Sequence, residues 1–409
     1  MDEKKRAPKL RFKGFTDDWE QRKLGEITAR ITRKNHKLES VLPLTISAQY
    51  GLVDQREFFN KQIASKKLEN YLLIKHGEYA YNKSYSKEYP FGVIKRLNRY
   101  SSGVLSTLYI AFTPMNINSD YLEQYYDSTK WYREIYKRAT EGARNHGLLN
   151  ISPNDFFESI LKVPGNKLEQ SKITECLKLI SELITLQQRK LNQLKLLKKA
   201  MFQQLFTDNK TPILRFRGFN IAWKQCTLGD LVKIVGGGTP STKISKYWNG
   251  NINWYSPTEI GDQIYVNSSK KKITELGLKN SSAKILPGNR TILFTSRAGI
   301  GDMAIMTNDG TTNQGFQSWV INSNKVDIYF LYSLGKKLKK QAFRKASGST
   351  FLEISNSEVK KLSLFTPSFE EQTNIGNFLK TIDNQITLQQ ENINRLEQMK
   401  KFLLQNMFI

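Results

Sequence analysis

The histidines and cysteines of this 409-residue chain do not predict a metal site. His36, His76 and His146 are far apart, and none belongs to an H-E-x-x-H pattern. Cys176 and Cys226 form no C-x-x-C pair, which argues against zinc and against a disulfide framework. The chain also lacks a G-x-x-x-x-G-K-S/T loop for ATP, a G-x-G-x-x-G loop for a dinucleotide and a clustered acidic motif for a two-metal nuclease. We therefore expect no catalysis by this chain and no metal or cofactor bound to it.

A run of glycines is the nearest approach to a phosphate-binding loop. Gly236-Gly237-Gly238-Thr239-Pro240 is followed neither by a Lys-Ser/Thr pair nor by a convincing helix. We interpret it as a flexible loop whose backbone can come close to a surface or a phosphate group.

Polar residues in several expected turns favour binding over catalysis. In proteins that read DNA, Arg and Lys pair with guanine, Asn and Gln with adenine, and Ser and Thr with several base edges. Turn capping or solvation explains any single residue equally well, whereas their concentration favours contact with DNA. The residues that we expect to contact DNA are Lys83, Ser84, Tyr85, Ser86, Ser106, Thr107, Arg144, Asn145, His146, Gly237, Gly238, Thr239, Ser296, Arg297, Asn313, Gln314, Ser349 and Thr350.

The net charge of +26 points to a polyanionic partner. Lysines and arginines that neutralise phosphates release condensed counterions, which favours association. The excess lies in two blocks, residues 1–150 and 211–365, with nearly neutral stretches after each. A basic surface that serves only solubility is the alternative. A membrane partner is not expected, because the sequence has no lipidation signal, signal peptide, long basic amphipathic helix or bilayer-spanning apolar run; we expect a cytoplasmic protein.

Two stretches of the chain are close copies of each other. The first begins Pro8-x-Leu10-Arg11-Phe12-x-Gly14-Phe15, and ten of the eighteen residues in 8–25 are identical in 212–229. We call residues 8–25 and 212–229 the leading segments. An internal repeat of this kind predicts two related structural units.

A second pair of copies ends each half of the chain. Glu169-Gln170 recurs as Glu371-Gln372, and the ITLQQ sequence of residues 184–188 recurs at 386–390. Each half therefore consists of a leading segment, a variable domain and a tail.

Both tails are expected to be long helices. No Gly or Pro occurs from about 168 to 206, and apolar residues follow steps of four and three, as in a coiled coil. An isolated helix of this kind is not stable, so each tail needs a partner, and the obvious partner is the other tail. The expected seam consists of Ile173, Leu177, Ile180, Ile184, Gln187, Leu191, Leu194 and Lys198 in the first tail and of Ile375, Leu379, Ile382, Ile386, Gln389, Ile393, Leu396 and Lys400 in the second.

Polar residues occupy the same seam positions in both tails, at Gln187 and Gln389 and at Lys198 and Lys400. Such residues commonly fix the register of a coiled coil. A solvated gap at a frayed end is the alternative.

The variable domains are expected to mix helices and strands. Segments 103–112, 285–294 and 316–321 are typical of strands, and segments 121–137 and 326–345 are typical of helices. We interpret the aromatic residues of the helical segments as core, not as a platform for a ligand.

Together these features resemble the specificity subunit of type I restriction–modification enzymes. The resemblance is carried by the leading segments (Leu10–Trp19 and Leu214–Trp223), by Gly237-Gly238-Thr239-Pro240-Ser241 with Tyr247-Trp248-x-Gly250, and by the ITLQQ tails. It implies an α+β fold, in which two pseudo-symmetric mixed α/β target recognition domains are joined by two long helices that form an antiparallel intramolecular coiled coil. Ile409 should then lie near the start of the first domain.

With these elements the chain divides into a recognition domain at 1–165, a helix at 166–207, a second recognition domain at 208–366 and a second helix at 367–409. The first domain has Thr32-Arg33-Lys34-Asn35-His36-Lys37 where the second has its glycine-rich segment. The two domains have therefore diverged, as two readers of different sequences would.

The resemblance also implies a function. Each domain would read one half of a bipartite, asymmetric site in double-stranded DNA, and the coiled coil would set the gap. Methyltransferase subunits, expected in two copies, and a motor–nuclease subunit would bind this chain and bring S-adenosylmethionine, ATP and Mg²⁺ for adenine methylation or restriction. Two other functions remain open: a stand-alone sequence-specific DNA-binding regulator, and a nuclease or methyltransferase in its own right.

Overall fold

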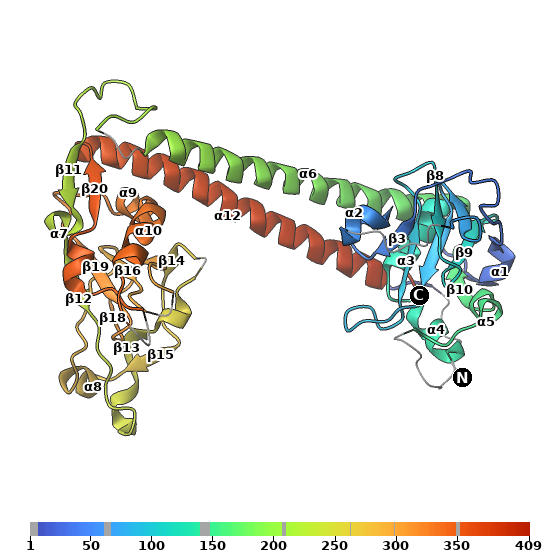
Figure 1. Cartoon of the computed structure of the whole chain (residues 1–409). Coiled ribbons are helices and arrows are strands. Elements are labelled where there is room, and N and C mark those ends of the chain that lie inside the picture. The colour runs from blue at the N-terminus through green and yellow to red at the C-terminus, as the bar shows by residue number, and fades with distance from the viewer. Residues whose placement is uncertain are drawn as a thin grey trace. The chain divides into compact units, whose positions relative to one another are not determined.

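The chain forms two compact units, shown in a computed structural model (Figure 1). Unit 1 comprises residues 1–188 and 391–409, and unit 2 comprises residues 189–390. Each unit therefore contains one variable domain, the beginning of one long helix and the end of the other. The structure describes residues 7–60, 67–139, 148–206, 210–261, 263–297, 299–348 and 352–409.

The domain of unit 1 is built on an antiparallel sheet with the strand order β2-β9-β6-β7. The antiparallel pairs β3-β4 and β5-β8 contact one another, and β3 and β4 contact the edge strand β7. The strands are β1 (Glu20–Lys23), β2 (Thr28–Arg30), β3 (Leu44–Ser47), β4 (Gly51–Asp54), β5 (Leu72–Lys75), β6 (Tyr79–Asn82), β7 (Val93–Arg96), β8 (Ser102–Leu105), β9 (Ile110–Pro114) and β10 (Ile160–Val163). The short helices are α1 (Leu24–Ile27), α2 (Gln55–Phe59), α3 (Ser119–Asp127), α4 (Tyr132–Arg138) and α5 (Pro153–Phe157).

The domain of unit 2 has a different sheet, with the strand order β12-β19-β16-β17-β14, and a smaller sheet β15-β13-β18. Strand β14 runs parallel to β17, so the larger sheet is mixed. The strands are β11 (Lys224–Thr227), β12 (Val232–Gly236), β13 (Trp248–Tyr255), β14 (Tyr265–Val266), β15 (Lys271–Ile273), β16 (Thr291–Phe294), β17 (Met303–Met306), β18 (Gly310–Thr312), β19 (Gln317–Ile321) and β20 (Ser363–Thr366). The helices are α7 (Leu228–Leu231), α8 (Glu275–Lys279), α9 (Ile328–Ser333), α10 (Gly335–Lys345) and α11 (Asn356–Lys360), with short 3₁₀ turns at Ser245–Tyr247 and Pro257–Glu259.

Both domains are closed at their base by the same antiparallel strand pair. In unit 1, β1 lies within the leading segment and pairs with β10, which comes just before the long helix. In unit 2, β11 pairs with β20 in the same way (Figure 1). The repeated parts of the sequence thus form a common base, and the diverged parts form the sheets above it.

Three expected elements are each divided into two where the sequence suggested one. Segment 103–112 forms the two strands β8 and β9, and segment 121–137 forms the two helices α3 and α4. The second break has a local cause, because the Ser128 hydroxyl donates to the Tyr125 carbonyl and accepts from the Lys130 amide. Serine side chains that bond to nearby backbone in this way compete with helix continuation.

The third divided element and the other expectations need smaller corrections. Segment 326–345 forms α9 and α10, which meet at the Leu334–Gly335 junction. Only residues 291–294 of the expected strand 285–294 belong to β16, whereas β19 matches the expected strand at 316–321. Most aromatic residues of the helical segments are core, as predicted: Tyr121, Tyr125 and Phe330 are at most 2% exposed. Tyr136 and Phe343 are exceptions, since their side chains are 70% and 60% exposed.

The long helices are α6 (Lys167–Leu205) and α12 (Phe369–Asn406). In unit 1, the start of α6 packs against the end of α12, since Ile173 and Leu177 share one core with Met407 and Phe408. In unit 2, the end of α6 packs against the start of α12, since Leu205 shares a core with Leu379. The predicted antiparallel coiled coil is therefore confirmed within each unit (Figure 1). The sixteen predicted seam residues are all buried or half-buried.

Candidate nucleic-acid interface

The leading segment fixes the domain of unit 1 to the long helices. Arg11 donates two hydrogen bonds to Glu169, with Nε 2.7 Å from Oε1 and Nη2 2.9 Å from Oε2. Trp19 Nε1 donates to the same carboxylate at 3.3 Å. The Glu169 side chain is only 1% exposed, so this is a buried, bidentate ion pair. The ion pair explains why Arg and Glu occur at matching positions of both halves.

The same ion pair occurs in unit 2. Arg215 Nε lies 2.9 Å from Glu371 Oε1, and its Nη2 lies 2.6 Å from Oε2. The hydrogen bond to the carboxylate is the largest cause of the raised pKa of Arg215. Within this repeated segment, Gly14 and Gly218 have φ values of 95° and 94°, a conformation that favours glycine and explains its repetition.

The glutamine that follows each of these glutamates binds the N-terminal end of a helix in the domain, α3 in unit 1 and α9 in unit 2. Gln170 Oε1 accepts a hydrogen bond from the Asn118 amide at 3.1 Å, and Gln372 Oε1 accepts one from the Asp327 amide at 3.1 Å. Asn118 and Asp327 are the N-caps of α3 and α9. The Glu-Gln pair of each tail therefore fixes both the leading segment and the domain.

The end of each tail closes the base of the domain that it meets. The Leu10 amide donates to the Asn406 carbonyl at 2.9 Å, and the Leu214 amide donates to the Gln204 carbonyl at 3.0 Å. Phe408 packs on Tyr121 in unit 1, where Ile409 also joins the core. The predicted position of Ile409 near the start of the first domain is confirmed.

Asp120 adds a charged link between α6 and the sheet of unit 1. Its Oδ1 accepts a hydrogen bond from Arg96 Nη1 at 2.7 Å, and its Oδ2 accepts one from Lys178 Nζ at 2.5 Å. Burial acts to raise the pKa of Asp120, but the bonds from Lys178 and Arg96 outweigh it, and the pKa is lowered.

The glycine run of unit 2 is closely packed. A Cβ atom at Gly237 would lie 1.9 Å from the Asn313 carbonyl oxygen, and one at Gly238 would lie 2.3 Å from the Ala283 amide. Gly238 also donates to the Thr312 carbonyl and accepts from Trp254 Nε1. These glycines are therefore required by packing inside the domain, which corrects our interpretation of a flexible loop.

Two further segments of unit 2 with predicted DNA contacts, at residues 313–314 and 296–297, lie around this packed turn. The Thr239 hydroxyl donates to the Gln314 side chain, which is exposed. Asn313 is half-buried, and its side-chain oxygen accepts the Gly315 amide. The Ser296 amide donates to the Gly315 carbonyl at 2.7 Å, so these loops are neighbours.

Residues 296 and 297 differ in what they can offer to a ligand. Ser296 is fully buried, and its hydroxyl has no hydrogen-bond partner among the described residues. Arg297 is exposed, and its Nε lies 2.9 Å from Glu353 Oε1. Of the two, Arg297 is the one whose side chain can reach a base or a phosphate.

The predicted contacts of unit 1 lie on two loops. Ser84, Tyr85 and Ser86 follow β6 and are exposed, and Thr107 is exposed between β8 and β9. Lys83 is half-buried, with its Nζ 3.3 Å from the Ile151 carbonyl. The Ser106 hydroxyl accepts the Leu108 amide, as in a turn cap. The remaining predicted contacts, Arg144, Asn145, His146, Ser349 and Thr350, lie outside the described residues.

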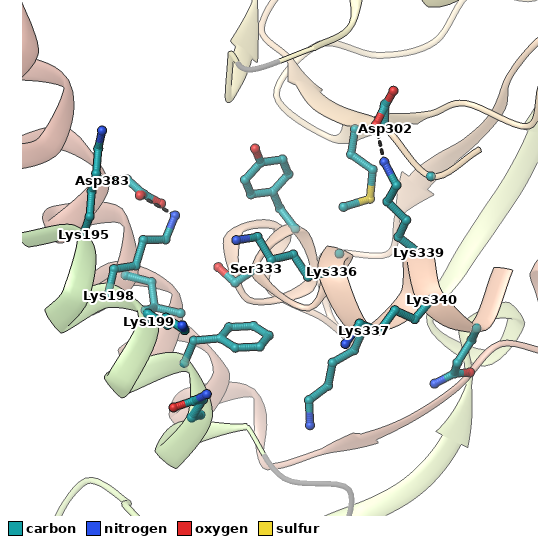
Figure 2. A pocket seen from close by; sticks show the side chains of 18 of the residues that line it. Lys195, Lys198, Lys199, Asp302, Ser333, Lys336, Lys337, Lys339, Lys340 and Asp383 are labelled. Atoms are coloured by element: carbon teal, nitrogen blue, oxygen red, sulfur yellow. Dashed lines mark hydrogen bonds and ion pairs between the residues drawn. The ribbon is translucent and has the colours of Figure 1, made fainter. Parts of the chain in front are cut away.

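A basic cleft of about 1290 Å³ in unit 2 was not predicted from the sequence (Figure 2). We define the basic cleft by its two walls: Lys195, Lys198 and Lys199 come from α6, and Lys336, Lys340 and Arg344 come from α10. The signal was present in α10, whose sequence GKKLKKQAFRK places basic residues around a buried Leu338 and Ala342. The opposite wall could not be found from the sequence, since α6 is far away along the chain.

Within the described residues, no three His, Cys, Asp or Glu side chains are grouped so that they could hold a metal ion. In the same residues, no helix has the length and apolar character needed to cross a membrane.

Comparison with known sequences finds a matching domain and several relatives. Residues 220–398 match the type I restriction modification DNA specificity domain. The chain is 37% identical over 190 residues to the type I restriction enzyme MjaIX specificity subunit of Methanocaldococcus jannaschii, and 31% identical over 200 residues to the EcoR124I/EcoR124II specificity subunit of Escherichia coli. This part of the chain is therefore similar to the DNA specificity domain of type I restriction enzymes. The matched parts cover 46% of this chain in both cases, and 44% and 48% of the two relatives, respectively.

Two solved structures of S subunits have a similar fold. The S subunit of a type I restriction–modification system from M. genitalium superposes with a TM-score of 0.60 at 15% identity, covering 98% of this chain and 99% of that one. The HsdS subunit of Thermoanaerobacter tengcongensis gives a TM-score of 0.50 at 16% identity, covering 95% and 96%. At these identities the likeness concerns the fold, which is the predicted α+β architecture.

Proposed function

We propose that this chain is a specificity subunit that reads a bipartite site in double-stranded DNA, with each domain recognising one half. The observation that carries the proposal is the repeated base. Arg11–Glu169 and Arg215–Glu371 fix two different sheets to equivalent places on two helices. Identical attachment of unlike domains is the arrangement expected of two readers with different targets, and the paired helices are suited to set their separation.

The chain's own residues support binding without catalysis. Its excess charge favours association with phosphates, and exposed polar side chains such as Tyr85, Arg297 and Gln314 are available to base edges. In this proposal, S-adenosylmethionine, ATP and Mg²⁺ are bound by methyltransferase and motor–nuclease partners, which carry out adenine methylation and restriction.

A second apolar row on α6 supports partner binding. Leu179, Leu183 and Leu186 are spaced by four and three residues, and they are 60%, 44% and 59% exposed. They lie beside the seam residues, so the packing of α6 against α12 leaves their side chains exposed. Apolar residues at this spacing are typical anchors for another helix, and we assign this row to a methyltransferase subunit.

Replacement of one domain tests the proposal. Residues 28–159, which lie between β1 and β10, would be exchanged for the corresponding segment of another specificity subunit, and methylated adenines would be mapped in cells that also produce the methyltransferase. We expect one half-site to change and the other half-site to persist. A change in both half-sites, or in neither, would contradict the assignment of one half-site to each domain.

A stand-alone regulator is the competing function. Such a protein would select its site in the absence of any partner, whereas the proposed subunit would gain site selectivity when methyltransferase is added. Comparing the affinities for cognate and unrelated duplexes with and without methyltransferase separates the two functions.

A further inference from the structure

The basic cleft carries more positive charge than its own residues can neutralise. Asp383 and Asp302 are the acidic residues of its lining, and each is already paired: Asp383 with Lys198 at 2.5 Å, and Asp302 with Lys339 at 2.5 Å (Figure 2). The other cations that define the cleft have no ion-pair partner among the described residues; they are Lys195, Lys199, Lys336, Lys340 and Arg344. All five are exposed.

The cations of α10 lie in a row. Lys336, Lys340 and Arg344 are spaced by four residues and therefore share one face of the helix. Leu338 and Ala342 are 1% and 0% exposed, so they hold the opposite face in the core of unit 2. At 1.5 Å per residue the row is about 12 Å long. One strand of duplex DNA carries a phosphate about every 3.4 Å along the axis, so the row matches roughly three phosphates.

Part of the lining of the cleft is apolar. Phe202, Met303 and Leu379 contribute apolar side chains to the lining. Figure 2 shows Lys336 and Lys337 on the α10 side of the space and Lys195, Lys198 and Lys199 on the α6 side. A ligand with several negative charges can therefore meet cations from both walls at once.

Unit 1 repeats the base of the domain but only part of this charge pattern: Lys401 corresponds to Lys199, whereas other positions differ. In the tail repeat, Lys195 corresponds to Glu397. Lys400 corresponds to Lys198, and its Nζ lies 3.9 Å from Asp127, which also pairs with Lys95 at 2.6 Å. A partner that docks on both halves would need the same chemistry twice. DNA contacts can differ between the halves, because the two domains differ.

We infer that the basic cleft binds the phosphate backbone of DNA without regard to sequence, next to the half-site that the domain of unit 2 reads. This inference rests on the proposed function and deepens it. The cleft would contribute affinity and orientation, whereas the loops around Gln314 and Arg297 would contribute selectivity.

The test is the salt dependence of DNA binding by the full chain with its methyltransferase. A triple variant, Lys336→Gln, Lys340→Gln and Arg344→Gln, keeps most of each side chain and removes three charges. We expect it to bind a cognate duplex and an unrelated duplex about 10- to 100-fold more weakly, with the slope of log K against log salt reduced by about 2 to 3. Its preference for the cognate duplex should be unchanged.

The matched control removes three exposed charges from unit 1, with Arg133→Gln, Arg395→Gln and Lys401→Gln. Its salt slope should change by less than about 1. Circular dichroism would verify that both variants are folded. Equal slopes for the triple variant and the control would overturn the inference.

Two other outcomes are informative. If the triple variant keeps the wild-type salt slope but no longer binds the methyltransferase, the cleft is a protein-docking surface and the inference is wrong. If the wild-type protein shows no preference for any mapped site, the proposed function itself fails, independently of the cleft.

Discussion

Lys198 Nζ lies 2.5 Å from Asp383 Oδ1, which joins the two long helices within unit 2. The second carboxylate oxygen of Asp383 accepts a hydrogen bond from Tyr329 of α9 at 2.8 Å, and the Asp383 side chain is 6% exposed. The polar seam residue Lys198 thus takes part in a network that includes both helices and the domain. The register of the two helices is therefore specified by this polar network as well as by apolar packing.

Replacing Lys198 with Met should destabilise unit 2 by about 2 kcal/mol, because Asp383 would remain buried with only Tyr329 as a partner. Lys400→Met is the matched control in unit 1. There the acceptor Asp127 retains Lys95, so the cost should stay below about 1 kcal/mol. Urea denaturation of both variants measures the difference. If both variants lose the same free energy of unfolding, the contact of Lys198 with Asp383 does not specify the register.

Replacing Arg215 with Gln should loosen the base of unit 2. Glu371 is 1% exposed and would lose its ionic partner, which costs about 3 kcal/mol in comparable buried pairs. Hydrogen exchange should accelerate in β11 and β20 and remain unchanged in β1 and β10. Arg11→Gln should give the reverse pattern. If hydrogen exchange becomes faster in all four strands of either variant, the bases of the two domains are not stabilised independently of each other.

Replacing Asp120 with Asn tests the charged link between α6 and the sheet of unit 1. The pKa of Asp120 is lowered from its usual value of 3.8, so the folded state favours its charged form. The associated stability is present above pH 3.8 and is lost as the pH falls through the lower, folded-state pKa. Because Asp120 is 38% exposed, we expect a cost of only about 0.5–1 kcal/mol at pH 7.

Urea midpoints of wild type and Asp120→Asn, measured from pH 7 downward, should converge below pH 3.8. A difference that persists unchanged into the acid range would mean that the Asp120 charge is not its cause.

Replacing Leu183 and Leu186 together with Gln should weaken co-purification with methyltransferase while leaving the chain folded. Both side chains are exposed, so their loss removes little internal packing. Lys190→Gln, an exposed change on the same helix, serves as the control. If the double variant co-purifies with methyltransferase as well as the wild type does, the second apolar row is not a docking site.

The tails were the most predictable part of the chain. Heptad spacing at residues such as Ile173 and Ile375 depends only on nearby sequence, and the predicted helices agree with α6 and α12 to within a few residues at most ends. The break at Ser128 was not predicted, because one hydroxyl–backbone bond ended a helix whose apolar pattern continued.

The candidate sites were less predictable for a physical reason. Gly237 and Gly238 read as a free loop, yet their neighbours Asn313 and Ala283 come from distant parts of the chain. The basic cleft likewise needs α6 and α10 together. Local patterns do not encode such tertiary contacts. The two ion pairs are different, because the repeat itself could have predicted them: Arg11 and Glu169 in the first half stand at the same positions as Arg215 and Glu371 in the second.

Inserting one heptad into each long helix, after Gln188 and after Gln390, tests the central claim that the helices set the distance between two readers. Seven residues lengthen each helix by about 10 Å, or roughly three base pairs of DNA. In cells that also produce the methyltransferase, mapping of methylated adenines should reveal the same two half-sites with a gap about three base pairs longer. Methylation at the original gap would contradict the account.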